Sequence, residues 1–313
     1  MPTDSPKGSG AKKIAVFLPS LEGGGAERSM LNLTKGFLAQ GRKVDIVLCQ
    51  AKGAYLGDIP EGATMIELEA SSNLPARWAV ASVNLGDFLA LLRPVLLAKK
   101  ISAEVARLKS LQRYILHSRP DVILSALPYA NLCAIWAKQL SGSNVSVVVS
   151  ERIALSTYCK APSNFRKWRW RYLPELVKRT YPKSDGVIAV SDHVANDLIK
   201  TIGLPEGCVT AVRNPVVDDT LRSRAQRTLE HAWFAPDAVP VILAAGRLTE
   251  QKDFATLIHA FASVRANREA RLVILGEGRL RDDLEQLACN LGIQADVYMP
   301  GFVENPFQYM ARA

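Results

Sequence analysis

The stretch from Lys13 to Cys49 reads KIAVFLPSLEGGGAERSMLNLTKGFLAQGRKVDIVLC. It opens with a short apolar and β-branched run, Lys13–Leu18, which is typical of a strand buried on both faces. A loop at 19–25 leads into a helical pattern that stops at Gly41, and Val44–Cys49 is the next strand. A strand, a helix and a second strand in this order indicate a parallel sheet that is covered by helices.

The same unit recurs along the chain and predicts an α/β fold of doubly wound parallel sheets. Further strands are expected at Asp121–Ala126, Val145–Ser150, Gly186–Ser191, Cys208–Arg213, Val241–Gly246, Leu272–Leu275 and Val297–Met299. We predict a disordered leader at 1–12, one domain at 13–213, a polar linker at 214–240 and a second domain at 241–313. With three strands, the second domain is expected to be incomplete, because such sheets usually have about five or six strands.

Composition excludes some classes of function but does not select a single one. The chain has 313 residues, which fits about two domains, and its net charge is +9 from 39 Lys and Arg against 30 Asp and Glu. That excess favours an anionic partner such as phosphate, nucleic acid or an acidic membrane, although an ordinary basic soluble protein fits as well. The five cysteines form no C-x-x-C pair and the histidines show no ligand spacing, so we expect a reducing cytosol and no metal site.

The first glycine-rich loop, Glu22–Arg28, lies between a predicted strand and a predicted helix. Gly24 and Gly25 would let a ligand approach the backbone, and the helix N-terminus favours an anion. A tight turn explains the same residues. A dinucleotide fingerprint fails here, because Arg28 occupies the third glycine position and no acidic residue ends the second strand.

Three loops at consecutive strand ends of the second domain carry glycine and charge. The first is GRLTEQK at Gly246–Lys252, in which Arg247 and Lys252 can close on one diphosphate, although a solvated charged loop is the plain alternative. The second is LGEGRL at Leu275–Leu280, where Glu277 can accept a hydrogen bond from a hydroxyl or a base. The third is PGFVENP at Pro300–Pro306. Ligands of α/β folds bind at such strand ends.

These loops resemble the donor domain of family 4 glycosyltransferases. The resemblance rests on AGRLTEQKDFATLIHAF, LVILGEGRLRDDLEQLACNLGI and MPGFVENPFQYMARA, on LPSLEGGGAERSMLNLTKGFLAQG near the start, and on VVSERIA, SDGVIAVSD and VRNPV. It covers most of the chain from Lys13 to Ala313.

The resemblance implies a GT-B architecture of two Rossmann-like domains and retaining transfer of a sugar from a nucleotide sugar, with UDP expected. Arg247 and Lys252 would hold the donor diphosphate and offset the charge of the leaving group, so that no metal and no cofactor is expected. The other donor-binding residues implied by the family are Gly24, Gly25, Gly246, Glu277, Phe302 and Val303. The acceptor would be a lipid-linked sugar or a polysaccharide.

The family's Glu-x7-Glu element lies one strand beyond the point where this sequence ends. We therefore expect a truncated chain, and a non-catalytic nucleotide-sugar-binding remnant or scaffold is the alternative function. A nucleotide-sugar epimerase of similar architecture is a third reading.

Glu151 and Arg152 follow a predicted strand, and relatives that act on lipid-linked acceptors show a similar S-E-R. Either residue could position the acceptor, and a buried ion pair explains them equally well. The segments Trp78–Ala98 and Asn164–Tyr172 are the candidates for a membrane contact. The first predicts a buried or interfacial helix, and the second, NFRKWRWRY, suits either an interface or a helix with buried tryptophans. We expect a cytoplasmic protein that is peripheral on the inner face of the membrane, with no nucleic acid partner.

Overall fold

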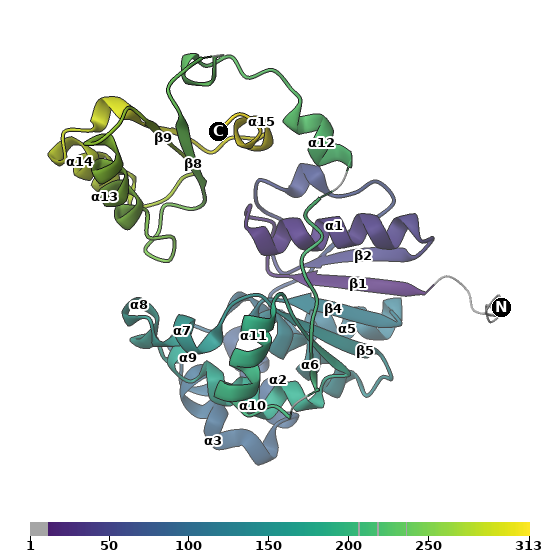
Figure 1. Ribbon diagram of the computed structural model, residues 1–313. Helices are drawn as coiled ribbons and strands as arrows, with labels where there is room; N and C mark the ends of the chain where they lie inside the picture. Colours follow the sequence, from purple (N-terminus) through teal and green to yellow (C-terminus); the bar gives the residue numbers. More distant parts are fainter. Residues whose placement is uncertain (1–11, 206, 218, 236) are drawn as a thin grey trace. The chain divides into compact units, whose positions relative to one another are not determined.

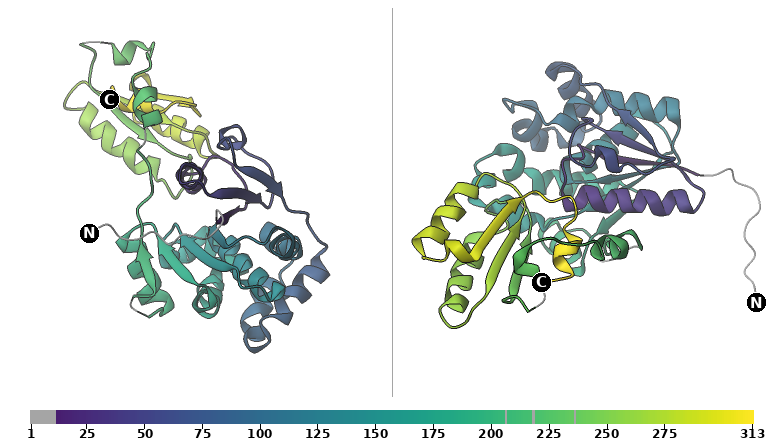
Figure 2. Two further views of the ribbon diagram at one scale, coloured as in Figure 1. Left: turned by 90° about the vertical axis from the view of Figure 1, so that its right-hand side faces the viewer. Right: turned by 90° about the horizontal axis from the view of Figure 1, so that it is seen from above.

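The computed structural model describes residues 12–205, 207–217, 219–235 and 237–313. The chain divides into two compact units, Met1–Val216 and Val217–Ala313, each with its own parallel sheet (Figure 1). Figure 2 follows the same units by colour, from purple to teal for the first and from green to yellow for the second. Apart from Lys12, the predicted leader lies outside the described residues.

In its described residues the first unit has a seven-stranded sheet with the order β3-β2-β1-β4-β5-β6-β7, and every pair of neighbours is parallel. The strands are β1 (Lys13–Leu18), β2 (Lys43–Leu48), β3 (Thr64–Glu67), β4 (Val122–Ala126), β5 (Ser146–Glu151), β6 (Gly186–Ala189) and β7 (Val209–Ala211). The sequence prediction missed β3. This edge strand is short and mostly exposed, so it lacks the apolar run that marks the buried strands.

Helices cover both faces of this sheet. They are α1 (Gly25–Ala39), η1 (Leu56–Asp58), α2 (Asn73–Ser82), η2 (Leu85–Asp87), α3 (Phe88–Leu91), η3 (Leu92–Leu96), α4 (Ala103–Ala106), α5 (Leu108–Ser118), α6 (Pro128–Ser141), α7 (Leu155–Lys160), α8 (Pro162–Phe165), α9 (Trp168–Arg171), α10 (Leu173–Thr180), η4 (Tyr181–Lys183), α11 (Asp192–Asp197) and η5 (Leu198–Ile202).

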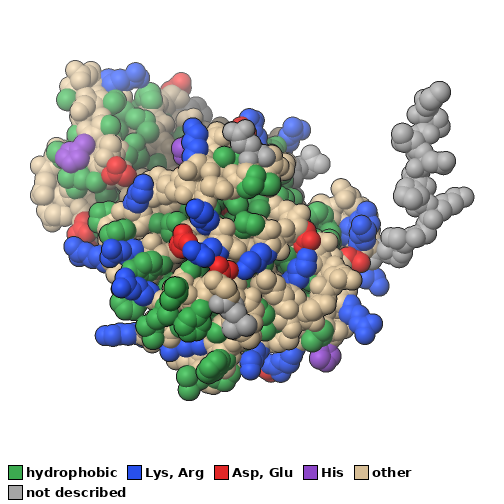
Figure 3. All heavy atoms as spheres, turned by 90° about the horizontal axis from the view of Figure 1, so that it is seen from below, with side chains coloured by type: hydrophobic (Ala, Val, Ile, Leu, Met, Phe, Trp, Pro, Cys, Tyr) green, Lys and Arg blue, Asp and Glu red, His purple; other side chains and the backbone are tan. Residues whose placement is uncertain are grey.

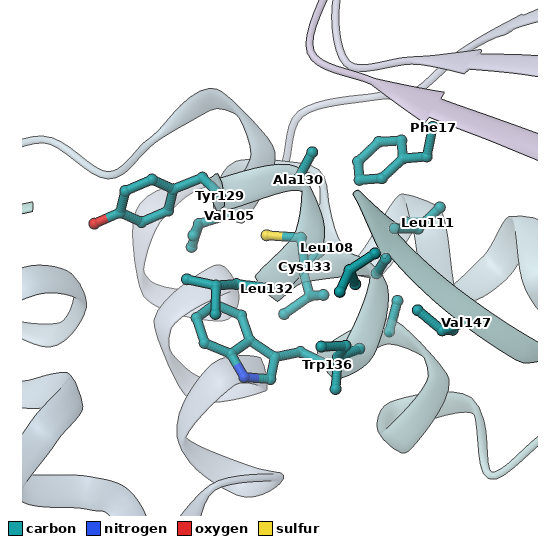
Figure 4. Packing of buried hydrophobic residues seen from close by; sticks show 14 of the residues in the cluster. Phe17, Val105, Leu108, Leu111, Tyr129, Ala130, Leu132, Cys133, Trp136 and Val147 are labelled. Carbon is teal, nitrogen blue, oxygen red and sulfur yellow. The ribbon is translucent and has the colours of Figure 1, made fainter. Parts of the chain in front are cut away.

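Alternate residues of β1 enter different cores, as the pleat of a strand requires. Val16 packs in a cluster with Met30 of α1, whereas Phe17 packs in the opposite cluster with Leu111 of α5 and Trp136 of α6. Figure 4 shows Phe17, Leu111 and Trp136 gathered in this second cluster, where all three are fully or almost fully buried. A sheet that is buried on both faces explains the near-continuous apolar runs of the sequence.

The apolar segment Trp78–Ala98 is not one helix. It runs through the end of α2, then α3 and the π-helical turn η3, which contains Pro94. Proline removes a backbone donor and disturbs regular helix, which accounts for the break. In the described part of the chain we find no helix with the length and apolar character needed to cross a membrane.

The second unit has, in its described residues, a three-stranded sheet with the order β10-β9-β8. Its elements are α12 (Asp219–Ala225), η6 (Ala232–Phe234), β8 (Val241–Ala245), α13 (Phe254–Arg265), β9 (Arg271–Leu275), α14 (Arg281–Asn290), η7 (Gln294–Asp296), β10 (Val297–Gly301) and α15 (Phe307–Met310). Phe261 of α13 and Leu284 of α14 share one core with Leu272 of β9, so both helices pack on the sheet.

The division between the units falls inside the segment 214–240, which the sequence suggests as a linker. Part of this segment is ordered against the second unit. The Asn305 side chain donates to the Arg224 carbonyl of α12 at 2.9 Å, and the ring of His231 lies 4.9 Å from that of Tyr298, centre to centre. The polar composition of the segment does not predict these contacts, because only a few aromatic residues within it make them.

Candidate functional site

The three predicted loops of the second unit lie together at the carboxyl ends of β8, β9 and β10. The backbone N–H of Gly246 donates to the Leu275 carbonyl at 2.9 Å, and that of Gly276 donates to the Gly301 carbonyl at 2.8 Å. The N–H of Leu248 donates to the Glu277 carbonyl at 2.9 Å. The parallel sheet therefore brings the three motifs to one edge, as the sequence predicts for its strand ends.

Gly276 makes this close packing possible. Its φ is +136°, and a Cβ atom at this position would lie 2.1 Å from the Gly246 carbonyl oxygen. Gly278 is equally confined, because its Cβ would lie 2.3 Å from the Leu248 carbonyl oxygen. Glycine at both positions lets two loop backbones touch, which no residue with a side chain allows.

Arg247 and Lys252 are exposed on this edge, and within residues 219–235 and 237–313 we find no ion pair for either. The lysine stem lies beside the glycine at the end of β8, since a Cβ atom on Gly246 would be 3.2 Å from Lys252 Cε. The nearby acids have other partners: Glu250 pairs with Arg279, and Glu277 pairs with Arg281 at 3.3 Å. Two uncompensated cations on a glycine-rich edge can bind a diphosphate.

Asp253 caps helix α13 directly after this loop. Its carboxylate accepts from the Thr256 N–H at 3.4 Å and from the Thr256 hydroxyl at 2.9 Å. The residue adopts φ +50°, so the chain turns sharply between Lys252 and the helix. The cap fixes where the loop ends and thereby limits the positions open to Lys252.

Glu277, Phe302 and Val303 border the same edge. The Glu277 carboxylate is more than half exposed, and Arg281, which binds it, also donates to the Met299 carbonyl at 2.5 Å. Phe302 is 54% exposed, which is unusual for a phenylalanine ring, and Val303 is partly buried. An oriented carboxylate beside an exposed ring can accept from a hydroxyl and cover the flat face of a nucleoside.

In the first unit, the loop after β1 leads directly into helix α1. Gly23 adopts φ +102°, Gly24 is the N-cap, and Gly25 is the exposed first residue of the helix. No side chain caps this helix N-terminus. The Glu27 carboxylate lies beside this helix end, 2.3 Å from where a Cβ on Gly24 would be, so the end suits a polar ligand better than a fully charged anion.

Glu151, at the end of β5, is fully buried and so is no surface group. Its carboxylate accepts from the Tyr181 hydroxyl at 2.8 Å and from the Arg152 N–H at 3.1 Å. Burial raises the pKa of the Glu151 carboxyl to about 7, although both hydrogen bonds lower it. The structure thus gives this residue a role inside the unit.

Arg152 joins three segments that lie far apart in the sequence. Its Nη1 donates to the Ser29 hydroxyl of α1 at 2.9 Å and also to the Asn214 side chain, which follows β7. Its Nη2 lies 2.9 Å from the sulfur of Met30, and the Ser29 hydroxyl donates to Asn214 Oδ1 at 2.9 Å. Ser29 and Asn214 were not predicted as site residues, and the only signal for Asn214 was its position in the VRNPV segment.

The raised pKa of Glu151 predicts a pH-dependent stability. Because its folded-state pKa of about 7 lies above the ordinary value of 4.5, the stabilising effect of protonation is complete below pH 4.5 and is lost as the pH rises through 7. The side chain introduced by Glu151→Gln cannot ionise. Urea unfolding should therefore show that the free energy of unfolding falls between about pH 5 and about pH 8 by on the order of 3 kcal/mol less in this variant than in the wild type. Equal losses in both proteins would contradict the assignment.

Within the described ranges no three His, Cys, Asp or Glu side chains gather in a way that could hold a metal ion. On the edge formed by the three loops, the exposed side chains of Arg247 and Lys252 can hold an anionic ligand.

Comparison with known proteins shows the family of the chain. Residues 23–220 match the family model of Glycosyltransferase Family 4, and residues 226–313 match that of Glycosyl transferases group 1. The chain is 29% identical, over 96% of its length and 72% of the relative's, to a Campylobacter jejuni N-acetylgalactosamine-N,N'-diacetylbacillosaminyl-diphospho-undecaprenol 4-alpha-N-acetylgalactosaminyltransferase. A second Campylobacter jejuni enzyme, which transfers N-acetyl-D-galactosamine to a sugar chain on diphospho-undecaprenol, is 26% identical over 94% of this chain and 68% of its own.

Among solved structures, Anabaena HepE in complex with UDP-glucose superposes with a TM-score of 0.66 at 16% identity, over 96% of this chain and 72% of that one. At this identity the likeness concerns the fold, and it confirms the predicted pair of Rossmann-like α/β domains of GT-B type.

Proposed function

The chain belongs to glycosyltransferase family 4, and from this premise we propose that it transfers a sugar from a UDP-sugar to a lipid-linked or polysaccharide acceptor with retention of configuration. In this reaction the bond between the anomeric carbon and the diphosphate breaks, and a bond from that carbon to an acceptor hydroxyl oxygen forms. The hydroxyl proton and UDP leave. The observation that carries the proposal is a pair of exposed cations, Arg247 and Lys252, on the glycine-rich edge of the second unit, with no ion pair to either among the described residues of that unit.

We assign the donor diphosphate to Arg247 and Lys252. Negative charge grows on the diphosphate as the sugar leaves, and cations already in place stabilise that charge more than they stabilise the ground state. The Gly246 backbone lies beside Lys252 and admits a phosphate closely. This charge stabilisation is the catalytic role that we assign to the pair.

The nucleoside is assigned to Glu277, Phe302 and Val303, and the loop at Gly24 and Gly25 to the transferred sugar. Support for UDP comes from the solved relative, which holds UDP-glucose. The carboxylate of Glu277 suits a ribose hydroxyl, because its contact with Arg281 orients it.

For the acceptor we assign a role to Arg152, with Glu151 as its positioning residue. The two Campylobacter enzymes act on sugars carried by diphospho-undecaprenol, and a guanidinium suits the phosphate of such a carrier. Ser29 and Asn214 fix the side chain of Arg152, so its remaining N–H groups point in a set direction. We place the reaction at the cytoplasmic face of a membrane.

A screen of UDP-sugars tests this proposal. The purified chain is mixed with each UDP-sugar and with an undecaprenyl-diphosphate-linked sugar in detergent, and released UDP is measured. We expect release with one donor class, at least tenfold faster with the acceptor than without it. An isomerised sugar that appears without an acceptor would indicate an epimerase, and binding of UDP-sugars with no release from any would indicate a binding protein; either result overturns the proposal.

A further inference from the structure

Two segments far apart in the sequence form one surface of the first unit. η3, which contacts α2 and α3, packs against α9, and Arg93 of η3 donates to the Tyr172 hydroxyl directly after α9. The Tyr129 hydroxyl donates to the Arg169 carbonyl at 2.8 Å, which ties α9 to α6 as well. We call the exposed side of residues 73–100 and 158–172 the basic apolar surface.

Large apolar side chains of this surface point into solvent. Trp78 is 73% exposed, Leu89 is 85% exposed and Leu97 is 59% exposed. Leu74 lies one helical turn before Trp78 and is also mostly exposed, and Phe165 and Trp168 add two half-exposed rings. So many exposed apolar side chains on neighbouring elements indicate a contact surface, since scattered single residues are the norm elsewhere.

The two tryptophans of α9 have opposite roles. Trp170 packs edge-on against Tyr129 at 5.8 Å and Tyr158 at 5.2 Å, between ring centres, and so anchors the helix. Trp168 lies two residues away and is 47% exposed. Trp170 provides the core contact of α9, so packing inside the unit does not explain why position 168 holds a tryptophan.

The charged side chains of this surface are almost all positive. Residues 73–100 and 158–172 contain nine Lys and Arg and a single acid, Asp87. Arg179 at 3.0 Å and Lys183 at 2.9 Å already neutralise that acid. In the part of the chain that the structure describes, no ion pair involves Lys100, Arg166 or any other cation of these two segments. Figure 3 shows the face on which α3 lies, where green apolar side chains reach the surface among blue Lys and Arg.

A small hollow opens where the two segments meet. Pro94, Val95 and Tyr129 contribute apolar lining, and Lys100, Ser102 and Arg169 contribute polar groups. The hollow is too shallow to enclose a ligand, so it adds apolar area and positive charge to the surface without forming a pocket.

We propose that the basic apolar surface docks the protein on an anionic lipid bilayer. Tryptophan and leucine enter the boundary between headgroups and acyl chains, while lysine and arginine attract the negative leaflet. Single-stranded nucleic acid would use the cations and rings, but Leu74, Leu89 and Leu97 offer no stacking face for a base. The inference deepens the proposed function, because a lipid-linked acceptor requires an enzyme at the membrane, yet it is tested without any sugar.

Vesicle flotation tests the docking surface on the intact 313-residue chain. We expect binding to phosphatidylcholine vesicles with about 30% phosphatidylglycerol, at least tenfold weaker binding to pure phosphatidylcholine, and weakening at about 0.5 M salt. Trp78→Ser with Leu89→Ser, and separately Arg166→Glu with Lys167→Glu, should each reduce binding at least tenfold. The matched controls are Met65→Ser on the exposed edge strand β3 and Lys35→Glu on α1, which should bind like the wild type.

UDP titration of the same variants separates docking from donor binding. An unchanged urea-unfolding curve shows that the first unit of the two surface variants is folded, and an unchanged UDP affinity shows that their second unit is intact, so their loss of vesicle binding supports the docking surface. A wild type that binds UDP but ignores anionic vesicles overturns the docking proposal and leaves the proposed function standing. Vesicle binding without UDP binding does the reverse. Tighter binding to oligouridylate than to vesicles, lost in the same variants, also overturns it.

Discussion

Replacing Arg247 and Lys252 together by alanine is expected to weaken UDP binding by at least a hundredfold. Each substitution would remove a charge-assisted hydrogen bond to the diphosphate, worth roughly 1.5–3 kcal/mol. A change of about 1.4 kcal/mol corresponds to about a tenfold change in affinity. The single variants should each lose about tenfold or more. Calorimetric titration with UDP measures these losses directly.

Uridine and Arg268→Ala are the controls for this prediction. Uridine lacks the diphosphate, so its affinity should change little in either single variant. Arg268 is also exposed in the second unit, but it precedes β9 and so lies at the opposite edge of the sheet. Arg268→Ala should bind UDP like the wild type. Undiminished UDP affinity in Arg247→Ala and Lys252→Ala would refute the assignment of the diphosphate.

Gly276→Ala is expected to weaken UDP binding strongly and to destabilise the second unit. The new Cβ would lie 2.1 Å from the Gly246 carbonyl oxygen, at a φ of +136° that a side chain rarely adopts. Because the neighbouring atom belongs to the backbone, the loop from Gly246 to Lys252 must move. We expect about 3 kcal/mol lower stability of the second unit from strain and overpacking, and at least a hundredfold lower UDP affinity.

Gly292→Ala distinguishes collision from strain alone. Gly292 also has a positive φ, +69°, but no atom lies within 4 Å of a Cβ built there. This variant should lose only about 1 kcal/mol, from the left-handed backbone, and should keep its UDP affinity. If Gly276→Ala binds UDP as well as Gly292→Ala does, the contact between the two loops is not needed for the site.

Much of the fold follows from local pattern. Buried strands such as β1 and β4 are predicted because both of their faces meet helices, which leaves a continuous apolar run. The exposed edge strand β3 leaves no such run, and the order in the segment 214–240 depends on contacts with β10 and α15 that composition does not reveal.

The candidate site also contains residues that the sequence predicts and residues that it does not. The loops at Gly246–Lys252 and Leu275–Leu280 are visible in the sequence, because strand ends of a parallel sheet meet at one edge. The contact of Arg152 with Ser29 spans 123 residues and leaves no periodic trace. Likewise, the composition of Trp78–Ala98 shows that the segment is apolar. It does not show which of its side chains are exposed, because that depends on where the helix breaks at α3 and η3.

A crystal structure of the chain with UDP tests the central claim most directly. The account predicts that the diphosphate lies within hydrogen-bond distance of both the Arg247 guanidinium and the Lys252 ammonium, with the uridine beside Glu277 and Phe302. A diphosphate bound away from both cations would contradict it.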